Sequence, residues 1–215
     1  MKSAKAWFQV VFLGAGLLFI CPTPDAFAQN IRGKWGVGLR VGPSILTQDV
    51  SGSIEANTGP IISGNILYGL TDNFSMGLNL EWETHQAESV GDIGDINIFS
   101  LIPFIEFRPG GRQAFSPYAS LGIGININSF NEESGLFCVT TIGSGFCKIE
   151  PENTFALKFA GGFDYFVTPN LALNAEIGWK LNSGDSDVKV SGVGTISDDF
   201  RASVFNLLFG LRYYF

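Results

Sequence analysis

Eight segments of the chain alternate between large apolar residues and small or polar residues with a period of two. The clearest interior example is residues 74–83, where Phe74, Met76 and the apolar residues after them alternate with Ser75 and Gly77. A period of two is that of a β-strand with one apolar face. The segments that we expect to form strands are residues 35–42, 61–70, 74–83, 95–108, 118–128, 154–166, 171–181 and 205–215.

The last of these segments shows which face of the sheet is apolar, whereas segment 95–108 does not show it by itself. In the last, Leu211, Tyr213 and the terminal Phe215 belong to one unbroken apolar face. Segment 95–108 is apolar on both faces in its middle, and its orientation is therefore ambiguous. Placing Glu106 and Arg108 on the polar side turns Phe99, Leu101, Pro103, Ile105 and Phe107 to the apolar side.

The connections between these segments alternate between long and short, which places long loops at one end of the sheet and tight turns at the other. The polar faces are rich in Gly, Ser and Asn, whereas the opposite faces are nearly continuous Leu, Ile and aromatic residues. This pattern predicts an all-β fold, an eight-stranded antiparallel up-and-down transmembrane β-barrel with its apolar face in lipid. A soluble sandwich and a lipocalin-like binder with inverted faces are the alternatives.

Aromatic residues gather in two groups, beside the short turns and near the long loops, as in the interfacial belts of membrane barrels. The first group is Trp35, Tyr68, Phe74, Phe107, Phe115, Tyr118, Tyr165, Phe166, Tyr213 and Phe215, and the second is Trp82, Phe99, Phe155 and Trp179. After residue 28 no apolar run approaches the length of a membrane-spanning helix. Entry into a membrane would therefore require a closed sheet.

The polar faces carry five acidic and five basic residues, which the barrel would place in its interior. They are Arg40, Glu81, Glu83, Glu106, Arg108, Lys158, Asp164, Glu176, Lys180 and Arg212. Balanced charges in a narrow interior are expected to pair, because an isolated ion there loses its hydration. Eight strands leave an interior that side chains can fill, which favours a structural plug over a path for ions through Glu81, Glu106 and Arg212.

The first 28 residues have the features of a secretory signal peptide. Lys2 and Lys5 precede an uncharged stretch, residues 6–21, and a small-x-small motif ends at Ala28, before Gln29. The stretch is too short for a membrane anchor and is followed by two prolines. We expect cleavage between Ala28 and Gln29, which leaves one domain at residues 29–215.

Export changes the charge and the cysteine count of the chain. Loss of Lys2, Lys5 and Asp25 changes the formal net charge from −7 to −8, and an acidic exported protein is a poor partner for nucleic acid. Cys138 and Cys147 remain, and an oxidising compartment favours a disulfide between them. Acidic residues in the long connections around and after these cysteines are Glu132, Glu133, Glu150, Glu152, Asp185, Asp187, Asp198 and Asp199.

Three stretches of the chain resemble the small outer-membrane β-barrel family, which includes OmpA/OmpX-type and "porin family" domains. They are residues 116–124, residues 161–173 and the closing Gly-Leu-Arg-Tyr-Tyr-Phe of residues 210–215. The resemblance implies an outer-membrane location with both termini in the periplasm, and contact with outer-membrane lipids and lipopolysaccharide. It also implies that Phe215, with Tyr213 and Leu211, is similar to the recognition signal for the barrel-assembly machinery.

The resemblance leaves three functions open. A structural or adhesin-like role through the acidic loops, with a possible extracellular ligand, is favoured over a narrow porin-like channel. A lipid A-modifying enzyme ranks third, because the single histidine, His85, is expected in a solvated loop with only Ser89 and Glu83 near it. One histidine and two bridged cysteines do not build a metal site, and we expect no catalytic residues and no cofactor.

Overall fold

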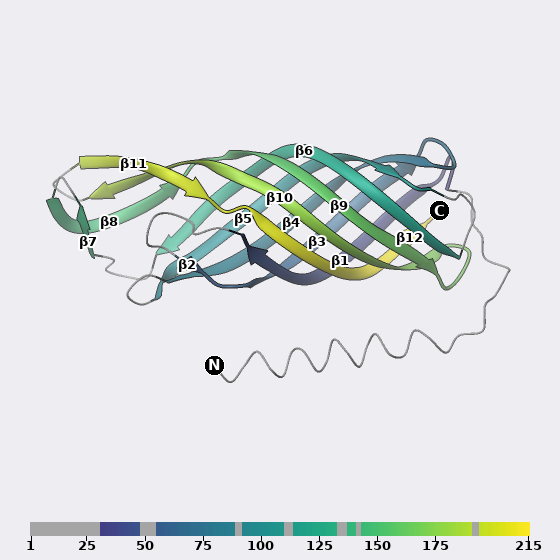
Figure 1. Cartoon of the computed structure of the whole chain (residues 1–215), viewed down its shortest axis with the longest axis horizontal. Helices are drawn as coiled ribbons and strands as arrows, with labels where there is room; N and C mark the ends of the chain where they lie inside the picture. The colour runs from purple at the N-terminus through teal and green to yellow at the C-terminus, as the bar shows by residue number, and fades with distance from the viewer. Residues whose placement is uncertain are drawn as a thin grey trace, which may run out of the picture.

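The computed structural model describes residues 31–47, 55–88, 92–109, 114–132, 137–140, 143–190 and 194–215. Eight antiparallel strands close into a barrel, since β12 pairs with both β10 and β1 (Figure 1). The barrel strands are β1 (Trp35–Leu46), β3 (Gly59–Gly69), β4 (Phe74–Glu88), β5 (Asp92–Phe107), β6 (Phe115–Glu132), β9 (Thr154–Phe166), β10 (Leu171–Val190) and β12 (Val204–Tyr214). The predicted eight-stranded antiparallel barrel is confirmed.

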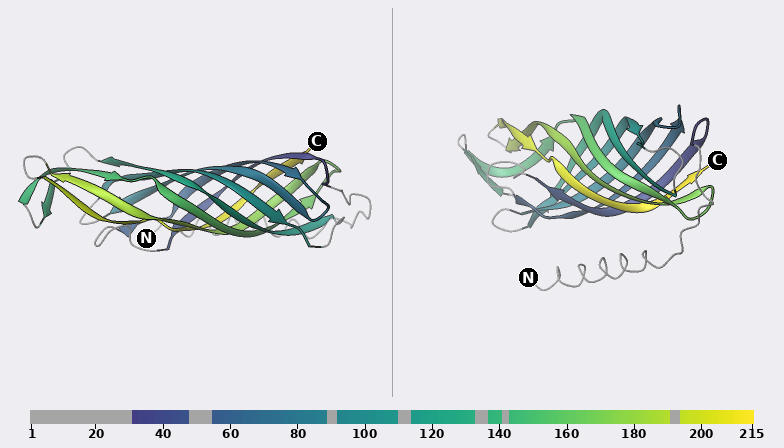
Figure 2. Two further views of the ribbon diagram at one scale, coloured as in Figure 1. Left: turned by 90° about the horizontal axis from the view of Figure 1, so that it is seen from above. Right: turned by 45° about the vertical axis from the view of Figure 1, so that its right-hand side comes forward.

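Four shorter strands lie outside the barrel wall: β2 (Glu55–Ala56), β7 (Phe137–Thr140), β8 (Gly143–Pro151) and β11 (Gly194–Arg201). The first part of β10 pairs with β9 and β12, whereas its last part pairs with β8 and β11. Strands β7, β8 and β11 and residues 183–190 of β10 therefore form a sheet, here called the extension sheet. It continues the barrel wall beyond one end, as Figures 1 and 2 show.

The two ends of the barrel are therefore different. The short-turn end carries the connections β3–β4, β5–β6 and β9–β10 together with Phe215, and the extended end carries the extension sheet. The sequence predicts loops in the two longest connections, residues 129–153 and 182–204. In the structure much of each connection is strand. Alternation of polar and aliphatic residues from Asp187 to Val190 is the sequence feature that continues β10.

Side chains follow the period of two around the whole wall. Large apolar residues face outward, as in β1, where Leu39 is 61% exposed, while its neighbour Arg40 is buried at 1%. Strand β5 has the expected orientation, because Phe99, Ile105 and Phe107 are exposed and Glu106 is buried. An apolar outer face around a polar interior is the arrangement of a lipid-exposed barrel and the reverse of a soluble one.

The seam between the first and last strands is closed by backbone hydrogen bonds of the terminal residue. The amide of Phe215 donates to the carbonyl oxygen of Trp35 at 2.8 Å, and the amide of Trp35 donates back at 3.1 Å. Farther along, the β1–β12 register passes from Val41 to Ser44 without pairs at Gly42 and Pro43. Proline has no amide hydrogen to donate to a neighbouring strand.

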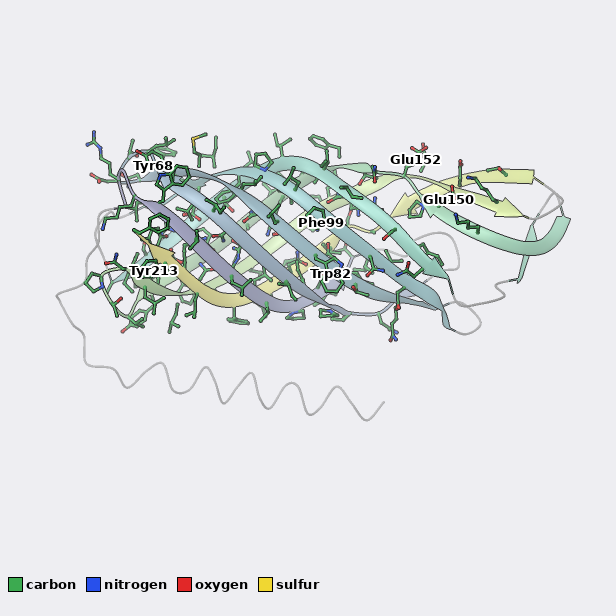
Figure 3. All side chains as sticks on the ribbon, turned by 180° about the vertical axis from the view of Figure 1, so that it is seen from behind. Tyr68, Trp82, Phe99, Glu150, Glu152 and Tyr213 are labelled. Carbon is green, nitrogen blue, oxygen red and sulfur yellow. The ribbon has the colours of Figure 1, made fainter. Side chains whose placement is uncertain are left out.

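Outward aromatic side chains pair at the short-turn end. Ring centroids lie 5.1 Å apart in both Trp35–Tyr68 and Phe74–Phe107. In Figure 3, Tyr68 and Tyr213 lie near this end, whereas Glu150 and Glu152 lie towards the other. Two residues expected in this outer group, Tyr118 and Phe166, are instead buried inside the barrel at 4% and 2% exposure, because both stand on the inner face of their strands. Among the described residues no helix is long and apolar enough to cross a bilayer.

Candidate functional site

The barrel interior holds all ten charged residues that the sequence places on the polar faces. Each is buried, with 4% or less of its surface exposed, and each lies within 4.0 Å of an oppositely charged partner. Six strands or their ends supply them, so the cluster exists only in the closed barrel. Five acids and five bases leave the formal charge of this set at zero.

Asp164 is the centre of the cluster at the short-turn end. Its Oδ2 accepts from Nη2 of Arg108 at 2.7 Å, from Nη1 of Arg212 at 3.0 Å and from the hydroxyl of Tyr214 at 2.7 Å. Glu106 also contacts both guanidinium groups, at 2.5 Å from Arg108 and 3.3 Å from Arg212. Two cations are thus held between two carboxylates, which offsets their loss of hydration.

The middle of the interior is crossed by a second cluster. Glu176 pairs with Arg40 through one oxygen and with Lys158, at 2.9 Å, through the other. Lys158 also pairs with Glu81. Arg40 donates further to Ser63 at 2.9 Å and to Asn79 at 3.0 Å, so this guanidinium is bound by three different strands.

A third cluster lies nearer the extended end. Lys180 pairs with Glu83 and donates to the hydroxyl of Ser100 at 2.8 Å. Glu83 also accepts from the hydroxyl of Ser44 at 2.6 Å. The ammonium of Lys180 is 3.7 Å from Glu81, which joins this cluster to the middle one.

Tyr118 and Asn174 join the middle cluster to the short-turn cluster. The Tyr118 hydroxyl donates to Glu176 at 3.0 Å, and the Asn174 amide donates to Tyr118 at 3.0 Å and to Asp164 at 2.7 Å. The guanidinium carbons of Arg108 and Arg212 lie 5.2 Å and 5.1 Å from the centre of the Tyr118 ring, within cation–π range. The polar groups therefore form one connected network along the barrel.

Apolar clusters lie at both ends of this network, and the sequence did not predict them. At the short-turn end the cluster consists of Ile31, Leu67, Phe104, Phe166, Ala172 and Tyr214. Towards the extended end it consists of Ala87, Ile96, Ile98 and Ala202, with Leu46 and Phe130 packed against them. The apolar inner face of residues 95–108 was the one sequence feature that could have revealed them.

His85 lies in the barrel interior, and the prediction of a solvated loop histidine was wrong. Strand β4 runs five residues beyond the predicted end of its segment, and His85 is fully buried on its inner face. It is therefore not positioned at an exposed rim. Ser89 lies outside the described residues, and within them no group of three His, Cys, Asp or Glu side chains could hold a metal ion.

The extension sheet carries a small ion-pair network of its own. Glu150 on β8 pairs with Lys148 at 2.8 Å and, across the strands, with Lys189 of β10 at 2.5 Å. These two ammonium groups lower the pKa of the exposed Glu150 carboxyl to about 2. Asp187 stands opposite Glu150 in register, and Asp185 stands opposite Asp199.

We expect the pairing of β8 with β10 to be insensitive to pH from 7 down to about 5 and to weaken as the pH falls from there towards 2. Because the folded-state pKa of Glu150 is depressed, its contribution is present above the ordinary glutamate pKa and disappears as the pH falls through about 2. Hydrogen exchange of the Ile149 amide, corrected for the intrinsic rate, measures this. High salt should weaken the protection that the ion pairs of Glu150 give to the Ile149 amide. Glu150→Gln should remove the loss of protection at low pH. If this variant keeps the same loss, Glu150 is not the group responsible for it.

The remaining predicted sites are only partly placed. Cys138 on β7 stands opposite Gly145 on β8, so Cys147 is two residues farther along the same paired strand. Their side chains are outside the described part of the structure, and the disulfide stays a prediction. Ala28 and Gln29, the predicted cleavage site, also lie outside it. Leu211, Tyr213 and Phe215 face outward, with 49%, 47% and 62% of their surface exposed.

A family model described as "Outer membrane protein beta-barrel domain" matches residues 13–215. The match covers every strand of the barrel and of the extension sheet. No curated protein matches the chain.

Several solved structures share the fold. The outer membrane protein OprG from Pseudomonas aeruginosa superimposes with a TM-score of 0.67 at 17% identity, over 87% of this chain and 98% of that one. AlkL, an outer membrane protein solved in lipid bilayers, gives 0.56 at 15% identity, over 91% and 95%. The Neisserial surface protein A gives 0.53 at 14% identity, over 86% and 100%. At these identities the likeness concerns the fold alone.

Proposed function

Because the chain belongs to the family of outer membrane protein beta-barrel domains, we propose that it is a non-enzymatic integral barrel that acts at the cell surface through its extension sheet. The protein lies in the outer membrane. In the proposal both termini are periplasmic, and the extension sheet is extracellular. Its partners are then outer-membrane lipids and lipopolysaccharide around the wall, and an extracellular ligand at the sheet.

The observation that carries this proposal is the continuation of barrel strands into the extension sheet. One strand, β10, runs for 20 residues and pairs first within the wall and then with β8 and β11 beyond it. Backbone ladders order these segments, so a partner would meet a preformed surface and pay less conformational entropy than with a flexible loop. The extension sheet carries both negative and positive charge, from Glu150, Lys148 and Lys189.

The interior supports a structural use of the barrel rather than a wide pore. Its charged groups are paired with one another, and apolar clusters lie at both ends of the network. An ion crossing this interior would have to break buried pairs, each of which was desolvated in forming. Eight strands leave little further space.

A narrow channel is the second candidate, and a specific observation favours it. Several buried polar atoms in the interior have no hydrogen-bond partner within the described structure, namely Nε of Arg40 and Arg212, Oε2 of Glu81, and both side-chain polar atoms of Asn65 and of Asn206. Buried polar groups in proteins are usually satisfied by protein or water. A hydrated path along these atoms would serve small ions.

Conductance in planar lipid bilayers distinguishes the two candidates. For the refolded full-length barrel we expect no steady ionic current, because the ion-pair network and the apolar clusters block the interior. A double substitution that removes one complete pair, Glu81→Ala with Lys158→Ala, should open a small conductance without leaving a buried charge from that pair. Steady current through the unmodified protein would favour the channel and contradict the plugged barrel.

Epitope tags test the proposed orientation. A tag placed in the β10–β11 connection, residues 191–193, should be detected by antibody on intact cells. A matched tag in the β3–β4 turn at residues 71–73 should be detected only after the outer membrane is permeabilised. The opposite pattern would place the extension sheet in the periplasm and end the surface-interaction proposal.

The C-terminal strand provides the remaining proposed contact. Leu211, Tyr213 and Phe215 present one outward apolar row, and we propose that this row is read by the barrel-assembly machinery. The proposal of no enzymatic activity rests on the position of His85, which is enclosed by the barrel wall instead of lying beside the lipid.

A further inference from the structure

The residues just before the first wall strand fold back into the short-turn end of the barrel. Ile31 lies four residues before β1 begins at Trp35, yet its side chain is buried. It belongs to the apolar cluster of that end, whose other members come from β3, β5, β9, β10 and β12. One side chain from outside the wall therefore completes a cluster to which five wall strands contribute.

A tight turn over residues 31–34, here called the entry turn, brings Ile31 to this position. The amide of Lys34 donates to the carbonyl oxygen of Ile31 at 3.0 Å, and Gly33, the third residue of the turn, has a φ of +73°. A positive φ at this place is that of a type II turn and favours glycine. A Cβ built on Gly33 would meet no atom within 4 Å, so the backbone conformation alone favours glycine here.

The entry turn is fixed to the end of β3 by backbone contacts. The amide of Gly33 donates to the carbonyl oxygen of Gly69 at 2.8 Å, and the amide of Gly69 donates to the carbonyl oxygen of Lys34 at 3.0 Å. A Cβ built on Gly69 would lie 1.9 Å from the carbonyl oxygen of Ile31, so the two backbones pack directly together. These contacts lie outside the ladders that join β1 to β12 and to β3. Loss of the entry turn therefore removes no pair from those ladders.

Tyr214 connects the apolar cluster to the charged groups beneath it. Its ring centroid lies 5.6 Å from that of Phe166, and its hydroxyl donates to Asp164 at 2.7 Å. Asp164 in turn binds Arg108 and Arg212. Water that passed the apolar cluster from the short-turn end would therefore reach the ionised groups of the interior.

We propose that the entry turn is a removable stopper, in which Ile31 seals the short-turn end while the barrel wall stays closed without it. Withdrawal of the turn admits water and small solutes to that half of the interior. The apolar cluster at the extended end, which contains no residue of the entry turn, keeps the other half closed. The proposal does not depend on the orientation of the barrel or on the extension sheet, so its failure would leave the surface role untouched.

Cysteine accessibility in lipid nanodiscs, which leave both barrel ends in contact with water, tests the stopper. The protein is first prepared with its three cysteines replaced by serine. Ala172→Cys then probes the cluster at Ile31, and Ala202→Cys probes the cluster at the extended end, because both alanines are fully buried. Ile31→Gly should raise the rate at which a charged methanethiosulfonate modifies Ala172→Cys by about tenfold or more, since burial of an isoleucine side chain accounts for at least that factor. The rate at Ala202→Cys should not change.

A second variant removes the turn and keeps the isoleucine. Gly33→Val places a β-branched residue at a φ of +73°, which such residues strongly disfavour, and it should also speed the modification of Ala172→Cys. Gly64→Val is the matched control, because a Cβ at Gly64 likewise meets no atom within 4 Å and Gly64 has no positive φ. This control should leave the rate unchanged.

The heat-dependent shift on detergent gels shows whether each variant keeps a closed barrel. We expect a closed barrel and fast modification of Ala172→Cys in Ile31→Gly. An unchanged rate would show that other side chains seal this end, and loss of the barrel would show that the wall depends on Ile31; either result overturns the proposal.

Hydrogen exchange gives the same comparison without any introduced cysteine. The Gly69 amide donates to Lys34 of the docked turn, so it should exchange about tenfold faster or more in Ile31→Gly than in the unmodified protein at the same pH. Equal exchange in the two proteins would contradict the stopper even if the cysteine variants do not fold.

Discussion

Replacement of Asp164 by alanine is expected to lower the free energy of unfolding by about 3–5 kcal/mol. Asp164 accepts hydrogen bonds from Arg108, Arg212, Tyr214 and Asn174, all in the barrel interior. Among the described residues, removal of its carboxylate leaves Glu106 as the one acid in contact with two buried guanidinium groups. An uncompensated buried cation is costly because neither water nor a counter-ion replaces the lost partner.

Urea unfolding in lipid vesicles, followed by tryptophan fluorescence, measures this effect. Asp72→Ala is a suitable control, because Asp72 lies exposed in the β3–β4 turn and surface substitutions change stability little. Loss of the heat-dependent shift on detergent gels would report failure to form the barrel. If Asp164→Ala stays within about 1 kcal/mol of the unmodified protein, the two arginines have other compensation and the network is less tightly coupled than its geometry indicates.

Gly42→Ala is expected to have the second largest effect, by forcing apart the seam that closes the barrel. A Cβ at Gly42 would lie 1.8 Å from the backbone oxygen of Leu207 on β12. Backbone cannot rotate away as a side-chain end can, so the strands must separate. Overpacking of this kind costs about 1–3 kcal/mol, and here the cost falls where pairs at Gly42 and Pro43 are already missing from the β1–β12 register.

The chain offers a matched control for this substitution on the neighbouring strand. A Cβ at Gly64 on β3 would meet no atom within 4 Å, and Gly64→Ala should leave stability and folding yield unchanged within experimental error. The unfolding midpoint in urea and the fraction folded on unheated gels compare the two variants. Equal behaviour of the two alanines would show that the seam tolerates separation at Gly42.

The strand pattern was readable from the sequence because lipid and the narrow interior demand opposite residue types. Even the ambiguous segment, residues 95–108, was oriented correctly by a single consideration, the placement of Glu106 and Arg108 inside. The sequence did not predict the extension sheet, because the strand predicted at residues 171–181 ends before that sheet begins. Outside the bilayer both faces of a strand can be polar, so the contrast that reveals a wall strand is weaker there.

His85 also shows that the sequence pattern does not reveal where a strand ends. Its segment was expected to end at Glu83, and a histidine after a strand end is usually solvated. The structure continues β4 to Glu88 and turns His85 into the interior. β4 continues because its backbone pairs with β5 all the way from Phe74 to Glu88. The alternation within residues 74–83 carries no information about that partner strand.

The sequence by itself determined the inward and outward faces of the eight wall strands, because a period of two follows from the covalent geometry of an extended chain. It therefore determined the set of ten interior charges and the number of strands in the barrel wall. Only the tertiary structure decided which acid meets which base, where apolar side chains border the network, and how β8, β10 and β11 continue past the wall. Those features depend on the register and closure of strands far apart in the chain, and a local pattern carries no information about distance across the barrel.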